Sequence, residues 1–70
     1  MDAFTAISEP SRRVLLEVLL EGAQPVNALV SRTGMSQPVV SKHLRILREA
    51  ALVKVTPDGC LLYTSDAADE

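Results

Sequence analysis

The sequence of 70 residues has one cysteine, one histidine and only two aromatic residues, Phe4 and Tyr63. One thiol and one imidazole are too few for a multi-ligand zinc site, and a lone cysteine forms no intramolecular disulfide. No apolar run approaches the roughly 20 residues that a membrane span requires, and no signal peptide is readable. These absences predict a cytoplasmic protein without a metal or cofactor. Its core must consist of Leu, Val, Ile and Ala side chains.

A chain of this length forms one small domain, and its 47% hydrophobic and 23% charged residues are ordinary for a globular protein. The net charge of −2 hides an asymmetry along the sequence. Residues 31–54 carry five cations against the single acid Glu49, whereas residues 60–70 carry three acids and no cation. The average charge therefore does not exclude a nucleic acid as a partner, because the basic side chains cluster in the middle of the chain.

Apolar spacing predicts three helices in the first half of the chain. A short helix is expected within residues 2–7, a longer helix over about 10–21, and another short helix over about 27–33. Asn27 is expected to cap the third helix, and Gly34 to end it. The expected apolar stripe of the second helix consists of Val14, Leu15, Leu16, Val18, Leu19 and Leu20.

A fourth helix is predicted over residues 37–49, with Ser36 as its N-cap and only Met35 between this cap and Gly34. Two helices joined by so tight a glycine-containing turn are typical of a helix-turn-helix. On a helical wheel, the apolar arc holds Val39, Val40, His43, Leu44, Ile46 and Leu47. The opposite arc holds Gln37, Pro38, Ser41, Lys42, Arg45, Arg48 and Glu49.

The polar arc of this fourth helix suits a major groove. Small hydrogen-bonding side chains near its N-terminus fit base edges, and the cations further along fit phosphates. The pyrrolidine ring of Pro38 could touch a thymine methyl, although a proline early in a helix needs no such explanation. An ordinary solvated face is the alternative for the whole arc. The predicted DNA-binding residues are Ser36, Gln37, Pro38, Ser41, Lys42, Arg45 and Arg48.

A β-hairpin is predicted after the fourth helix. Residues 52–56 are mostly β-branched, residues 57–59 are turn formers, and residues 60–64 could form the returning strand. Helices followed by a hairpin predict a mainly α fold with a small β-hairpin, the winged helix-turn-helix.

Three segments resemble the ArsR-type (arsenic-repressor-like) family of bacterial transcriptional regulators: ISEPSRRVLL at 7–16, VNALV at 26–30 and MSQPVVSKHLRILREAALV at 35–53. The resemblance covers residues 1–59. It implies a dimeric repressor whose fourth helix and wing contact operator DNA until an effector, often a metal ion, releases it. Members that sense soft metals carry a Cys-x-Cys cluster on the third helix, where this chain has no thiol. Ala51 stands where the family often has glycine.

The last eleven residues, CLLYTSDAADE, resemble the translation of a transposase-type sequencing-library adapter. We therefore expect residues 1–59 to be an incomplete winged helix-turn-helix domain, truncated before its C-terminal dimerisation helix, and residues 60–70 to be a non-native tail. Leu61 and Tyr63 could still pair with the preceding strand by accident. The alternative is a natural strand followed by an acidic tail. A homodimer is expected for the intact parent and should be weak or absent for this chain.

Other chemistry finds little support in the sequence. His43 is expected to be a partly buried, hydrogen-bonded packing residue, and Arg12 and Arg13 to be solvated cations, with a phosphate contact as the lesser alternative. No nucleophile elbow or phosphate loop is present, which argues against an enzyme. The sequence thus predicts a DNA-binding repressor. The alternatives are a winged-helix module for protein–protein contact without useful DNA affinity, or an inert fragment.

Overall fold

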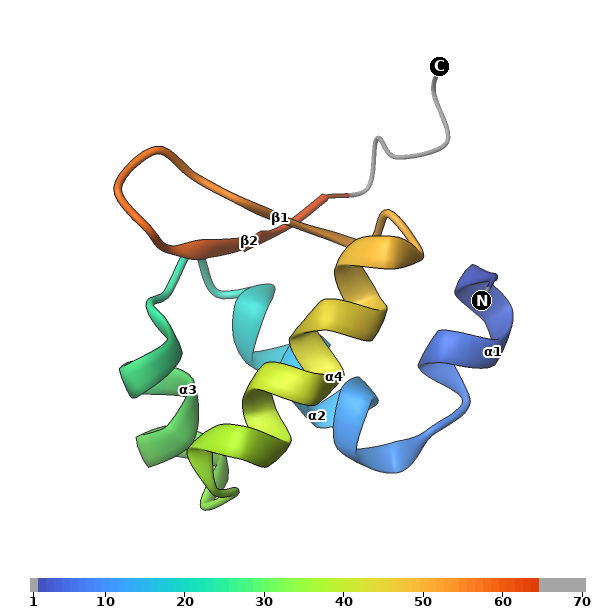
Figure 1. The fold of residues 1–70 in the computed structure, drawn as a ribbon, viewed down its shortest axis with the longest axis horizontal. Helices are drawn as coiled ribbons and strands as arrows, with labels where there is room; N and C mark the ends of the chain where they lie inside the picture. The colour runs from blue at the N-terminus through green and yellow to red at the C-terminus, as the bar shows by residue number, and fades with distance from the viewer. Residues whose placement is uncertain (1, 65–70) are drawn as a thin grey trace.

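A computed structural model of the chain describes residues 2–64 and contains four helices and one hairpin (Figure 1). The elements are α1 (Ala3–Ile7), α2 (Pro10–Leu19), α3 (Val26–Thr33), α4 (Gln37–Glu49), β1 (Val53–Val55) and β2 (Leu61–Tyr63). The predicted mainly α fold with a small β-hairpin is confirmed. Residues 65–70, which belong to the tail predicted to be non-native, lie outside the described residues.

The observed bounds of α4 are those predicted, but α3 begins earlier than expected. Pro25 is the N-cap of α3, with φ −75° and ψ 163°, and its carbonyl accepts hydrogen bonds from the backbone N–H groups of Ala28 and Leu29. Asn27 therefore lies inside the first turn, and its prediction as the cap is wrong. The extended conformation that proline favours already starts the helix without a side-chain cap.

The hairpin is an antiparallel pair that bonds to the connection between α2 and α3 and packs Val53 and Leu61 into the core. Val53 lies opposite Tyr63, and Val55 lies opposite Leu61. Leu61 also exchanges two backbone hydrogen bonds with Gln24, at 2.9 and 2.7 Å, in the connection between α2 and α3. Backbone pairing of this kind needs only a strand-forming segment after the turn, so it agrees with either origin of residues 60–64.

The core lies between the four described helices and the hairpin. It consists of Ala6, Leu15, Leu16, Leu19, Leu29, Val40, Leu44, Leu47, Val53 and Leu61. The predicted stripe of α2 is too wide, because Val14 and Leu20 are 42% and 65% exposed. The elements that pack against α2 leave these two side chains in solvent, and hydrophobic periodicity alone does not show how much of a helix its neighbours cover.

Arg12 is buried, although the sequence suggested a solvated cation. Its Nε donates to the Ala6 carbonyl oxygen at 2.8 Å, and its Nη1 lies 3.4 Å from the Nδ1 of His43. This burial occurs because α1 packs against both α2 and α4 and encloses the start of α2. His43 is half-buried and hydrogen-bonded, as predicted.

We call the hairpin of β1 and β2 the wing. The link from α4 to the wing passes through Ala51, whose φ is +63°. A β-carbon in this left-handed conformation is disfavoured, whereas glycine adopts it freely. We expect Ala51→Gly to raise the free energy of unfolding by about 0.5–1 kcal/mol, measured by urea denaturation. The control is Ala50→Gly at φ −85°, which should lower it by a similar amount. Equal destabilisation by both variants would contradict the strain at Ala51.

Candidate nucleic-acid interface

The turn between α3 and α4 sets the direction in which α4 leaves the body. Gly34 ends α3 in the left-handed conformation, with φ +78°, and its N–H donates to the Val30 carbonyl at 3.0 Å. The Thr33 hydroxyl donates to the Leu29 carbonyl at 2.7 Å and accepts from the Met35 N–H at 3.2 Å. These bonds complete the helix-turn-helix that the sequence predicted.

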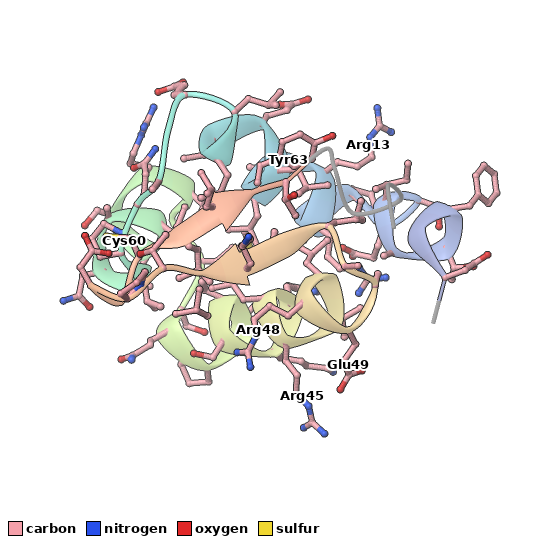
Figure 2. The ribbon with its side chains drawn as sticks, turned by 90° about the horizontal axis from the view of Figure 1, so that it is seen from above. Arg13, Arg45, Arg48, Glu49, Cys60 and Tyr63 are labelled. Carbon is pink, nitrogen blue, oxygen red and sulfur yellow. The ribbon has the colours of Figure 1, made fainter. Side chains whose placement is uncertain are left out.

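The structure brings all seven predicted site residues onto the solvent-exposed side of the helix-turn-helix. Exposed side chains are found at Ser36, Gln37, Pro38, Ser41, Lys42, Arg45 and Arg48. On the opposite side of α4, Val40, Leu44 and Leu47 are buried. Figure 2 shows Arg45 pointing away from the body of the molecule. We call this exposed surface of the seven residues the outer face of α4.

The N-terminal end of the outer face offers unpaired polar groups. Ser36 occupies the N-cap position without a side-chain cap hydrogen bond. No hydrogen bond links the Ser36 hydroxyl or the Gln37 amide to another residue within 2–64. The first N–H groups of any helix also lack partners within that helix and favour anions. This end of α4 can therefore bond base edges and a phosphate without breaking contacts inside the protein.

The cations of the outer face differ in their partners. Arg45 forms an ion pair with Glu49 at 3.3 Å, and both side chains are more than half exposed. Lys42 and Arg48 form no ion pair within the part of the chain that the structure describes. An exposed pair of this spacing contributes little stability, so Arg45 can exchange Glu49 for a phosphate. The i,i+4 spacing of Arg45 and Glu49 was readable in the sequence, although the pair was not predicted.

The wing lies beside α4, and the two border an open hollow of about 200 Å³. Ser41 and Arg48 line this hollow from α4, and Val55 and Gly59 line it from the wing. Lys54 on β1 is exposed and adds a cation that the sequence prediction did not assign to the site, although it belongs to the basic segment 31–54. The hollow joins helix and wing into one concave surface.

The wing turn also carries an anion, which the sequence analysis missed. A hydrogen bond from the Thr56 hydroxyl, followed by the Cys60 backbone N–H, holds the pKa of Asp58 below its ordinary value. A carboxylate at this turn disfavours close approach to phosphate. Of the two charged wing residues, Lys54 is therefore better suited to contact DNA.

Groups outside this surface show little sign of other chemistry. Desolvation and the neighbouring Asp58 carboxylate raise the pKa of the Cys60 thiol, which disfavours the reactive thiolate. Across residues 2–64, no three His, Cys, Asp or Glu side chains are grouped as metal ligands. The same residues contain no helix long and apolar enough to cross a membrane. Arg13 lies on the side of the molecule away from Arg45 and Arg48 (Figure 2).

Known proteins are similar to this chain in sequence. Residues 9–55 match the family described as bacterial regulatory protein, arsR family. The chain is 33% identical to the transcriptional repressor SdpR of Bacillus subtilis (strain 168), over 91% of this chain and 71% of the relative. It is 34% identical to the nodulation protein NolR of Rhizobium meliloti, over 93% of this chain but only 53% of the relative.

A solved structure of a related regulator has the same fold as this chain. The crystal structure of a possible transcriptional regulator for arsenical resistance superposes with a TM-score of 0.88 at 33% identity, over 99% of this chain and 75% of that chain. The family match covers the helix-turn-helix and β1, which include the outer face of α4. The chain belongs to the arsR family of bacterial regulatory proteins, which are helix-turn-helix, DNA-binding transcriptional regulators and not enzymes.

Proposed function

We propose that the chain is a transcriptional repressor that binds operator DNA through α4 and the wing. The observation that carries this proposal is the outer face of α4. Its seven residues are exposed together, two of its three cations have no ion pair within residues 2–64, and its reverse side forms part of the core. A protein that binds an operator acts in the compartment that holds the chromosome, which for a bacterial regulator is the cytoplasm.

The residues divide into two roles. Ser36, Gln37 and Ser41 lie near the N-terminus of α4, where a recognition helix contacts base edges, and Pro38 between them can touch a thymine methyl. The cations Lys42, Arg45 and Arg48 lie further along the helix, where they can meet phosphates on either side of the groove. We propose no metal or cofactor for this interface.

The phosphate role predicts a change in salt dependence. Arg48→Ala should weaken binding to every duplex and reduce the slope of log affinity against log salt by about 0.9 per subunit. The wild-type chain first selects a duplex from random-sequence DNA, and a scrambled duplex of equal composition serves for comparison. The control is Arg13→Ala, which removes the same charge from the side away from Arg48 and should leave the slope unchanged. Equal slopes for Arg48→Ala and wild type would exclude the phosphate contact.

The base-reading role predicts a loss of affinity that is confined to the selected duplex. Gln37→Ala should reduce the discrimination between the selected and scrambled duplexes by about 1–3 kcal/mol if a bidentate base contact is lost. Binding to the scrambled duplex should hardly change, because that binding depends on phosphates. Fluorescence anisotropy titrations at several salt concentrations measure both quantities. Equal losses on the two duplexes would show that Gln37 reads no base.

The alternative, a winged-helix module that contacts another protein, requires an exposed apolar surface on α4. On α4 the structure exposes one large apolar side chain, Val39 at 41%, whereas Phe4 on α1 and Leu20 at the end of α2 are 76% and 65% exposed. We propose that a second copy of the chain binds weakly at this apolar surface of α1 and α2. Such a weak homodimer would leave the outer face of α4 free for DNA.

A further inference from the structure

Arg12 connects three helices from a buried position. Its side chain extends from the first turn of α2, and the residue is 8% exposed. The guanidinium Nε donates to the carbonyl oxygen of Ala6 in α1 at 2.8 Å, and its Nη1 lies 3.4 Å from the Nδ1 of His43 in α4. One rigid group thus contacts both helices that pack around the start of α2.

The partners of this guanidinium are unusual for a buried cation. A buried charge normally needs a carboxylate or several acceptors, but Arg12 forms no ion pair among residues 2–64. One acceptor is the carbonyl of Ala6 near the end of α1, where helix carbonyls lack partners within the helix. The other is the imidazole of His43, whose Nδ1 can accept only where it carries no proton. Such contacts fix the direction of a planar group more than they stabilise a charge.

His43 lies on the inner side of the proposed recognition helix. It directly follows Ser41 and Lys42 in sequence, and it lies one helical turn before the buried Leu47. A contact at this point restrains the rotation of α4 about its own axis. Rotation would displace the outer face, and side chains that read bases must be held within about 0.5 Å of their productive positions.

We propose that Arg12 is a positioning residue for DNA recognition, which fixes α4 against α1 through His43 and Ala6. The proposal rests on the proposed function, because it assumes that α4 reads DNA. It goes beyond that function by assigning specificity to a buried residue that touches no DNA. The proposal also assigns a tautomer to His43. An arginine only donates hydrogen bonds, so Nδ1 of His43 must accept, and the ring proton of the imidazole must be on Nε2.

The tautomer is tested directly, because His43 is the only histidine in the sequence. Nitrogen-15 NMR of the full chain at a pH where the imidazole is neutral should show a bare Nδ1 and a protonated Nε2. In Arg12→Met, which keeps an apolar stem and removes the donors, the spectrum should shift towards a mixture of the two tautomers. A proton on Nδ1 in the wild-type chain would overturn the contact.

The positioning role is tested with a matched pair of variants at His43. In His43→Asn, the side-chain oxygen takes the place of Nδ1 as an acceptor, whereas His43→Leu has nearly the same shape without an acceptor. We expect Arg12→Met and His43→Leu each to lose about 10-fold in affinity for the selected duplex and little for the scrambled one. His43→Asn should stay within about 3-fold of wild type, and the double variant Arg12→Met/His43→Leu should be no weaker than either single variant.

All titrations are made at a temperature where circular dichroism shows each variant to be fully folded. If folded Arg12→Met binds the selected duplex like wild type, Arg12 only stabilises the fold and the proposal is wrong. It is also wrong if Arg12→Met weakens both duplexes equally with a smaller salt slope, because Arg12 would then contact phosphate. If the wild-type chain itself does not discriminate between the duplexes, the proposed function fails and the positioning role fails with it. Failure of the positioning role alone leaves wild-type discrimination intact.

Discussion

Two copies of the chain joined by a flexible linker should bind a palindromic duplex about 10² to 10⁴ times more tightly than a single copy. A single winged helix contacts one half-site and bears the whole loss of translational and rotational freedom for that contact. In the joined protein, the second half-site is met at a high effective concentration. Half-sites lie about 34 Å apart, so a Gly/Ser linker of about 40 residues has a suitable root-mean-square length.

Two controls separate this effect from simple doubling of charge. On a duplex with one half-site, the joined protein should lose nearly all of its advantage over the single chain. With Arg48→Ala in both copies, affinity should fall while most of the ratio between palindrome and half-site remains. Equal affinities of the single and joined proteins for the palindrome would mean either that α4 does not read half-sites or that the single chain already dimerises, and sedimentation distinguishes these cases.

Helix α4 was the part of the fold that the sequence predicted best. Its apolar residues recur with helical spacing over the whole range 37–49, and Gly34 and Ser36 mark the turn before it. Because residues three or four positions apart share one face of a helix, the pattern predicted most of the exposed and buried sides of α4. Val39 is the exception, since it was predicted in the apolar arc but is 41% exposed. The exposure of all seven predicted site residues is a consequence of that periodicity.

The environment of α2 was not accessible in this way. The burial of Arg12 depends on α1 folding back and on His43, which lies 31 positions further along the chain. No local pattern encodes a contact at that separation. The exposure of Leu20 also depends on the tertiary structure, because the described elements leave its side chain uncovered at the end of α2. Spacing identifies an apolar stripe, whereas neighbours decide how much of it is covered.

Some contacts of the charged side chains at the candidate site could be predicted from neighbouring residues in the sequence. Arg45 and Glu49 are four residues apart in a predicted helix, and such residues meet on its surface. The contact between Thr56 and Asp58 is equally local, since Thr and Asp side chains often bond within turns. Only the hollow between Ser41 and Val55 required the tertiary structure, because it depends on where the wing folds against α4.

Leu47→Ala should unfold a large fraction of the chain at 25 °C. Leu47 is fully buried, and truncation of such a leucine costs about 2–5 kcal/mol, while a core of this size rarely supplies more than about 3–5 kcal/mol. The control is Leu20→Ala, the same change at a side chain that is 65% exposed, which should cost well under about 1 kcal/mol. Urea denaturation followed by far-ultraviolet circular dichroism measures both changes.

A substitution at the neighbouring residue Arg48 distinguishes an effect on DNA binding from an effect on stability. Leu47→Ala should lose DNA binding mainly through its unfolded fraction, because Leu47 lies in the core and makes no contact on the outer face. Arg48→Ala should lose binding while the urea midpoint stays near that of wild type, since Arg48 is exposed and forms no ion pair within residues 2–64. Identical midpoints for Leu47→Ala and Leu20→Ala would place Leu47 outside the core. A lowered midpoint for Arg48→Ala would show that the outer face of α4 also holds the fold together.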